Sequence, residues 1–201
     1  MIDNLEIIKP LLNFSEPGDF YMLYVFKRKK DQPEGEKDNH QSVRTIKAYC
    51  IESIDHLERR YAEIKQLCEM FKARAYIHVQ KQNHKDVSLE MMMALAERIK
   101  NGSHNQKGLF DSVVGQMKTH EKRWIIDVDT KDQVELDAIK YNINRFCRPE
   151  GDKVESTIPT KNGYHLITER FDVMEFKKHF PTIDIQKKNP TLLYLPESLE
   201  E

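Results

Sequence analysis

The sequence contains little cysteine, and the cysteines it has are scattered. Cys50, Cys68 and Cys147 are the only three among the 201 residues, and no two of them form a CxxC pair. This number and spacing argue against both a disulfide framework and a thiolate zinc site. The eight histidines also lack the close pairing of a zinc module. Such cysteine usage is typical of a reducing compartment, so we expect a cytoplasmic protein.

Long apolar runs are missing as well. No stretch approaches the roughly 18 apolar residues that a membrane-spanning helix needs. The N-terminal segment MIDNLEIIKPLL contains acidic residues and lacks the basic and then apolar layout of a signal peptide. We therefore expect that the protein has no membrane partner.

Neither sign of charge predominates. Lys and Arg number 32 against 33 Asp and Glu, which gives a formal net charge of -1. This balance excludes a uniformly basic coat of the histone type but is compatible with a local cationic groove for nucleic acid. Hydrophobic residues make up 39% of the chain, enough for the core of one large domain or of a compact domain with a small extension.

The first part of the chain shows a strand pattern followed by a helix pattern. Two apolar segments, 20–28 and 43–51, favour a hairpin around a polar, exposed loop, although a parallel arrangement is left open. Apolar residues stepping by four and three predict a helix over 55–72. Asp55 and Glu58 are expected to form the capping box at its start.

A Met-rich helix is predicted over 88–100, after a strand at 74–80 and before a further helix at 109–119. Its apolar residues recur at helical spacing, and we expect them to pack into the core rather than to bind a cofactor or partner. They are Leu89, Met92, Met93, Ala96 and Ile99.

The C-terminal part alternates strands and helices more regularly. Strands are predicted over 123–129, 153–158, 164–168 and 182–186, and helices over 132–146 and 172–179. Helices alternating with strands over the whole chain predict an α+β (or mixed α/β) architecture with sheets covered by helices.

Two carboxylates lie on the first of these strands. Asp127 and Asp129 are two residues apart and therefore share one face, while Ile126 and Val128 face a core on the other side. Burying an unpaired carboxylate is costly, so a strand this apolar needs compensation for two of them. Magnesium or manganese (Mg²⁺ or Mn²⁺) would supply it, since both prefer carboxylate and phosphate oxygens. As an alternative, Asp129 or Thr130 caps the following helix.

A second group of residues surrounds a predicted turn. Asn162 and Gly163 tolerate positive φ and would deliver His165 to the start of the next strand. Lys161 would stand at the tip of the turn, where its ammonium could hold a phosphate. The alternative is an ordinary hairpin with a surface lysine and a half-buried histidine.

The third element is an apolar strand interrupted by Asp184. This carboxylate could join the same metal site, and Lys187 or Lys188, which follow it, could meet a phosphate or a nucleic-acid backbone. An edge-strand aspartate that faces water is the alternative.

Together these elements resemble the motif series of archaeo-eukaryotic primases and primase–polymerases. That series consists of an apolar-Asp-apolar-Asp strand, then small-any-His, then an apolar-Asp strand. The chain has Asp127 and Asp129 in the first, Gly163 and His165 in the second, and Asp184 in the third, in that order. The resemblance covers only the C-terminal part of the chain.

The resemblance implies a fold and a chemistry. It implies an RRM-like mixed-sheet catalytic module over 121–201, joined to an N-terminal α/β unit over 1–120 that could bind nucleic acid, the two forming one compact body. Asp127, Asp129 and Asp184 would bind two divalent metal ions, and His165 would contact the phosphates of the incoming nucleotide. The expected partners are nucleoside triphosphates, a single-stranded DNA template and replication proteins. Small stand-alone relatives of this type occur in phages and mobile elements.

Three other functions remain open from the sequence. The chain could be a catalytically silent nucleic-acid-binding accessory in replication, or a metal-dependent nuclease or phosphohydrolase that uses the same aspartates. It could also be a structural domain whose three aspartates never meet in space.

Overall fold

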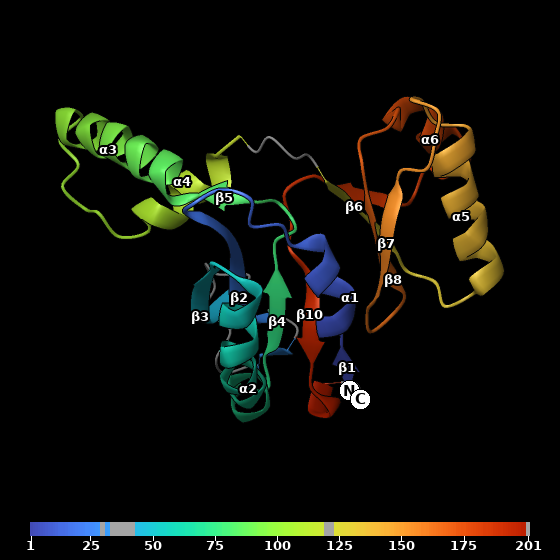
Figure 1. Ribbon diagram of the computed structural model, residues 1–201, viewed down its shortest axis with the longest axis horizontal. Coiled ribbons are helices and arrows are strands. Elements are labelled where there is room, and N and C mark those ends of the chain that lie inside the picture. The colour runs from blue at the N-terminus through green and yellow to red at the C-terminus, as the bar shows by residue number, and fades with distance from the viewer. Residues whose placement is uncertain (29–30, 33–42, 119–122, 200–201) are drawn as a thin grey trace.

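The computed structural model describes residues 1–28, 31–32, 43–118 and 123–199. Two antiparallel sheets, each with helices packed against it, form a mixed α+β fold (Figure 1). The α+β class expected from the sequence is therefore confirmed. The predicted exposed loop between 28 and 43 lies largely outside the described residues, and so does the predicted boundary at 120.

The first sheet has the strand order β1-β10-β4-β2-β3, with β5 paired to the start of β2. Its long hairpin is antiparallel, which settles the arrangement that the sequence left open. The strands are β1 (Ile2–Asp3), β2 (Asp19–Arg28), β3 (Val43–Ile51), β4 (Arg74–Ile77), β5 (Gln82–Asn83) and β10 (Thr191–Leu195). The sequence predicted no element at β10, which comes from the far end of the chain and pairs between β1 and β4.

One face of this sheet is covered by α2 (Ile54–Phe71) and by the short α1 (Leu5–Ile8) with the 3-10 turn that follows it. The predicted apolar stripe of α2 is buried from Leu57 to Cys68 and packs with strand residues of the sheet, whereas Phe71 at its end is 37% exposed. The predicted capping box is wrong, because the helix begins one residue earlier and Ser53 caps it by accepting a hydrogen bond from the amide of His56.

The start of β2 presents its other face to α3 (His84–Lys100) and α4 (Leu109–Gln116), where Phe20, Met22 and Val87 form a small core. The predicted α3 stripe does not belong to this core. Its large side chains are more than half exposed, because α3 packs through its opposite side and projects away from the body (Figure 1). The core packing expected for this stripe is therefore wrong.

The second sheet has the order β7-β8-β6-β9, with every neighbouring pair antiparallel. Along the chain its elements follow as strand, helix, strand, strand, helix, strand. They are β6 (Trp124–Val128), α5 (Gln133–Arg145), β7 (Val154–Pro159), β8 (Tyr164–Thr168), α6 (Val173–His179) and β9 (Asp184–Gln186). Both helices cover one face, where Ile126, Val128 and Leu166 are buried as the alternation along the strands predicted.

The opposite face of the second sheet meets the first sheet. Ile125, Ile158 and Ile167 point from it into the large core of the N-terminal part. The buried side chain of Asn4 fastens the junction, since its amide donates to the carbonyl oxygens of Pro159 and Leu192, each at 2.9 Å. The two sheets thus share one core.

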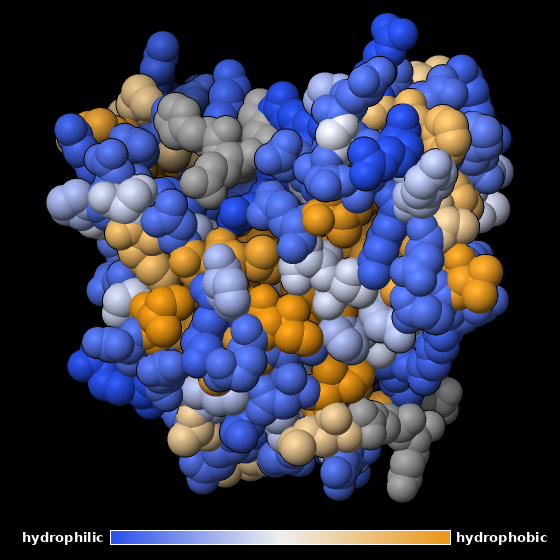
Figure 2. Space-filling model, turned by 45° about the vertical axis from the view of Figure 1, so that its right-hand side comes forward, coloured by the Kyte–Doolittle hydropathy of each residue, from blue (hydrophilic) through white to orange (hydrophobic). Residues whose placement is uncertain are grey.

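The outer surface is charged, as the composition requires. Hydrophilic residues cover most of the face seen in Figure 2, with apolar side chains gathered in patches near its middle. Among the described residues, no helix is both long and apolar enough to cross a membrane.

Candidate functional site

Strand register brings three of the predicted site residues into one row. Asp127 on β6 is paired directly with His165 on β8 and with Asp184 on β9. Directly paired residues of neighbouring strands point to the same side of a sheet, so these three side chains share one face. This is also the face that carries Ile125 and Ile167, so the row lies beside the junction of the two sheets.

A glutamine links the carboxylates of the row. The Gln186 amide nitrogen donates to Asp127 Oδ2 at 3.2 Å and to Asp184 Oδ2 at 3.1 Å. Gln186 is not among the site residues predicted from the sequence. Its position two residues after Asp184 on a strand places it on the same face, and this signal could have identified it.

His165 is 5% exposed and forms the inner end of the row. Its Nδ1 lies 3.0 Å from the Thr191 hydroxyl oxygen on β10, and its Nε2 lies 3.5 Å from Asp127 Oδ1. Burial, reinforced by the positive charge of Arg28, lowers the pKa of His165 to about 4. The ring is therefore neutral at pH 7 and its contact with Asp127 is not an ion pair. A neutral ring has one N–H, which we assign to Nε2 because an ionised carboxylate only accepts, leaving Nδ1 to accept from Thr191.

The surroundings of Asp127 disfavour the charged form of its carboxyl group. Burial raises the pKa of this carboxyl, and the negative charges of Asp129 and Asp184 raise it further. The positive charge of Arg28 and the hydrogen bond from Gln186 act in the opposite direction but do not cancel the effect. A bound cation would relieve this repulsion.

Asp129 lies just past the end of β6 and is exposed. It is not the cap of the following helix, because the carboxylate of Asp132 takes that position and accepts from the amide of Val134 at 2.9 Å. Thr130 accepts a hydrogen bond from the amide of Asp132. The capping alternative for Asp129 is therefore excluded, and its carboxylate accepts no hydrogen bond from the described part of the chain.

Gly163 brings the turn between β7 and β8 against this end of β6. A Cβ atom at Gly163 would overlap the carbonyl oxygen of Val128 and would lie 2.8 Å and 2.9 Å from the backbone nitrogen and oxygen of Thr130. The prediction that the turn depends on positive φ is wrong, since neither Asn162 nor Gly163 has it. Thr160 closes the turn instead, with its amide donating to the Gly163 carbonyl at 2.8 Å. Glycine is required here by close approach of two backbones.

The three predicted phosphate-binding lysines contact groups outside the row. Lys161 donates to the carbonyl oxygen of Leu199 at 2.6 Å, and Lys188 donates to that of Gly115 at 3.0 Å. The Lys187 ammonium lies 5.0 Å from the centre of the Trp124 ring. A role for these lysines with phosphate stays a prediction.

Arg28 is the cation whose charge acts on both Asp127 and His165. It lies at the end of β2 in the first sheet, where it donates to the Tyr76 hydroxyl and lies over the Tyr76 ring, 5.2 Å from its centre. Arg28 is not among the site residues predicted from the sequence, because only the packing of the two sheets brings β2 near β6. No sequence signal links the two strands.

The residues offer the oxygen donors that Mg²⁺ and Mn²⁺ prefer. The repulsion of the Asp127 carboxylate by Asp129 and Asp184 also fits a cation site. However, no three His, Cys, Asp or Glu side chains in the described ranges gather closely enough to hold a metal ion as they stand. The Gln186 amide lies between the Asp127 and Asp184 carboxylates and hydrogen-bonds to both.

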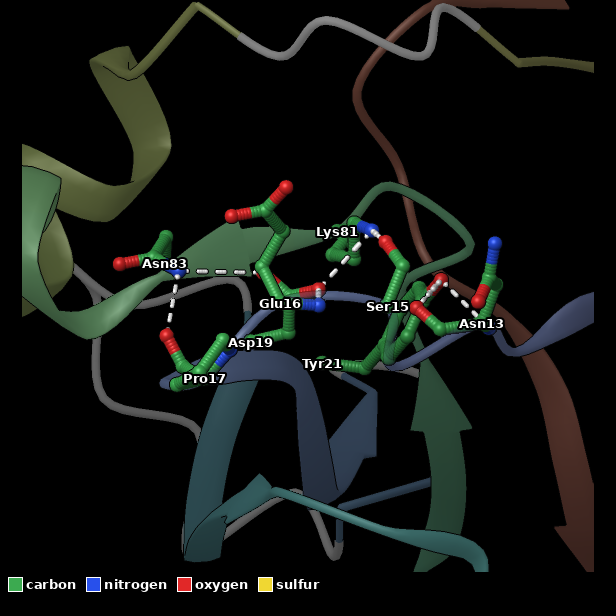
Figure 3. Close-up of polar contacts among 8 residues, drawn as sticks. All are labelled: Asn13, Ser15, Glu16, Pro17, Asp19, Tyr21, Lys81 and Asn83. Atoms are coloured by element: carbon green, nitrogen blue, oxygen red, sulfur yellow. Dashed lines mark hydrogen bonds and ion pairs between the residues drawn. The ribbon is translucent and has the colours of Figure 1, made fainter.

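Two open hollows of about 550 Å³ each lie elsewhere, around the loop before β2. Asp19, 4% exposed, accepts there from the Glu16 amide at 2.8 Å and pairs with the Lys81 ammonium at 2.9 Å (Figure 3). Burial alone would raise the pKa of Asp19, but Lys81, the Glu16 amide and Asn83 together hold it below its usual range. These polar groups satisfy one another, so we regard the cluster as structural.

Comparisons with known proteins found no relative of this chain. A scan against protein-family models, a search of curated proteins and a search of solved structures each found no match to this chain.

Proposed function

We propose that this protein is a metal-dependent nucleotidyltransferase that acts as a DNA primase or primase–polymerase on a nucleic-acid template. The observation that carries the proposal is the row formed by Asp127, His165 and Asp184. Three short motifs from separate parts of the sequence supply one residue each, and strand pairing sets them side by side. Asp129 follows at the end of the same strand.

The topology of the second sheet supports the proposal. A strand-helix-strand-strand-helix-strand chain with the order β7-β8-β6-β9 is the split βαβ arrangement, which RRM-like modules share. The resemblance implies such a module for 121–201 and an N-terminal α/β unit over 1–120. The second sheet and its helices take up 124–186 of that range, whereas β10 joins the first sheet. Fold alone does not establish activity, so the proposal rests on the site.

Each residue of the site has a distinct role in the proposed reaction. Asp127, Asp129 and Asp184 would hold Mg²⁺ or Mn²⁺, which when bound lowers the pKa of an attacking 3′-hydroxyl and neutralises the leaving pyrophosphate. His165 holds its proton at Nε2 and can donate it in a hydrogen bond to a phosphate oxygen. The fixed charge of Arg28 attracts a triphosphate towards the row.

The partners proposed are nucleoside triphosphates, a single-stranded DNA template and replication proteins. The test is extension of a 5′-labelled primer on single-stranded DNA with dNTPs or NTPs, and with Mg²⁺ or Mn²⁺. The wild type is compared with Asp127→Asn and with Asp137→Asn. Asp137 is an exposed aspartate on α5 and provides a matched control for the loss of one carboxylate.

Elongation by the wild type and Asp137→Asn, and its loss in Asp127→Asn, is the expected result. Metal-dependent shortening of the labelled strand without elongation would replace the proposal with a nuclease. Binding of single-stranded DNA with neither elongation nor shortening, unchanged by Asp127→Asn, would replace it with a silent accessory.

A further inference from the structure

Helix α3 has a second apolar face that the described structure leaves uncovered. One side of the helix packs through Val87, Met91 and Leu95 against the small core beneath it. The other side carries the exposed stripe, with Leu89 at 52% exposure, Met92 at 69%, Met93 at 58% and Ile99 at 51%. Soluble proteins rarely leave a continuous row of large apolar side chains in water unless the row meets a partner.

The spacing of the stripe is that of a coiled-coil seam. Leu89, Met92, Ala96 and Ile99 are separated by three, four and three residues, which are the a and d positions of a heptad repeat. The helix begins beside β5 and projects from the body (Figure 1). The stripe on its free face is exposed from Leu89 to Ile99. A second helix can therefore lie along it.

We propose that α3 pairs with α3 of a second copy of this chain in an antiparallel coiled coil. In this arrangement a positions face d positions of the other helix. Leu89 of one copy then faces Ile99 of the other, and Met92 faces Ala96, so that a large side chain fills the space above a small one. A parallel pair would instead place Ala96 against Ala96 and leave a gap.

The charges of α3 also favour the antiparallel orientation. The first half carries Lys85, Asp86 and Glu90, one positive and two negative charges, for a net of -1. The second half carries one negative and two positive charges, for a net of +1, from Glu97, Arg98 and Lys100. Antiparallel pairing sets each half opposite its complement and also opposes the two helix dipoles. Parallel pairing would set like halves together.

The length of the seam determines how tightly we expect the two copies to bind. Four layers of side chains bury an area close to the lower limit of about 1,000 Å² for a specific interface. We therefore expect a reversible dimer with a dissociation constant in the micromolar range rather than an obligate one. Because the bodies lie at opposite ends of the paired helices, the pairing leaves the row of Asp127, His165 and Asp184 unobstructed.

The test is sedimentation velocity of the whole chain from about 1 µM to several hundred micromolar, a range that brackets weak interfaces. The wild type is compared with Met92→Glu and with Met174→Glu. Met174 on α6 is also exposed, at 77%, and provides a matched control for placing glutamate at a surface methionine. Thermal unfolding and circular dichroism check that each variant is folded.

A monomer–dimer equilibrium in the wild type and Met174→Glu, and a shift of at least tenfold towards monomer in Met92→Glu, is the expected result. Asp86→Lys and Lys100→Asp should each weaken the dimer, and the double change should restore it. A wild type that stays monomeric at every concentration would overturn the proposal. A dimer that Met92→Glu leaves unchanged would overturn it equally.

Discussion

Gly163 determines how closely the turn before β8 approaches the end of β6. Replacing it with alanine places a methyl group on the carbonyl oxygen of Val128, and neither backbone can move without shifting its strand. We expect Gly163→Ala to destabilise the fold by about 2–4 kcal/mol, as overpacking against a rigid wall does. Urea unfolding measures this change.

Gly115 provides the matched control for that substitution. It lies in α4, and apart from its chain neighbours and the backbone of its own helix no atom lies within 4 Å of the position that a Cβ would take. Gly115→Ala should therefore leave stability unchanged or raise it by up to about 1 kcal/mol, because alanine is the better helix former. Equal destabilisation by both variants would show that Gly163 is not held by a close contact.

We expect that replacing Asp127 raises the stability of the fold but abolishes activity. Burial and the neighbouring carboxylates raise its pKa, so its charged form is destabilising at pH 7. Asp127→Asn removes that charge, and the His165 ring can change its tautomer to accept from the new amide. We expect a gain of about 1 kcal/mol in unfolding free energy together with loss of nucleotide incorporation. A variant that is both less stable and fully active would contradict this reading.

Among the elements, β10 links the first sheet to the proposed site. Its first residue, Thr191, is fully buried and its hydroxyl lies 3.0 Å from His165 Nδ1. Thr191→Val keeps the shape but frees the ring to turn. We expect roughly a tenfold loss in the rate of nucleotide incorporation with a cost in stability of only about 1 kcal/mol. Thr191→Ser should restore the rate, which a merely structural role of the threonine would not require.

The sequence predicted which residues share a face more reliably than what that face meets. The stripe of α2 and that of α3 look alike, yet the first is buried and the second is exposed. Helical spacing predicts which residues share one face of a helix, but it does not predict what that face packs against. The same limit applies to the site: Asp127 and His165 were identified from their strands, whereas Arg28 and Thr191 reach them only through the packing of two sheets. β10 was missed because its short apolar run follows a proline and has no alternation.

At the scale of the whole molecule, two buried histidines make stability depend on pH. Burial lowers the pKa of His78 to about 4, and burial with the charge of Arg28 does the same for His165. The unfolded chain binds these protons near pH 6.5 and the folded protein does not. The free energy of unfolding should therefore be highest above about pH 6.5 and should fall as the pH drops towards 4.

Between pH 7 and pH 4.5 we expect each histidine to lower the free energy of unfolding by on the order of 2 kcal/mol. Urea unfolding at the two values measures the sum. His78→Gln should reduce this pH dependence by about half, because glutamine does not titrate and His165 still does. An unchanged dependence in that variant would mean that His78 is protonated in the folded protein at pH 4.5.

Strand pairing sets Asp127 beside Asp184, and we propose that these two carboxylates, with Asp129 just past the end of the same strand, bind a divalent cation at which a nucleotide binds. Titration with Mn²⁺, followed by the electron paramagnetic resonance signal of the free ion, tests it without requiring turnover. We predict that the wild type and Asp137→Asn bind Mn²⁺, more tightly when a nucleoside triphosphate is present, and that the double variant Asp127→Asn, Asp184→Asn does not. Equal binding by the double variant, or no binding by the wild type at millimolar Mn²⁺ with nucleotide, would contradict the claim.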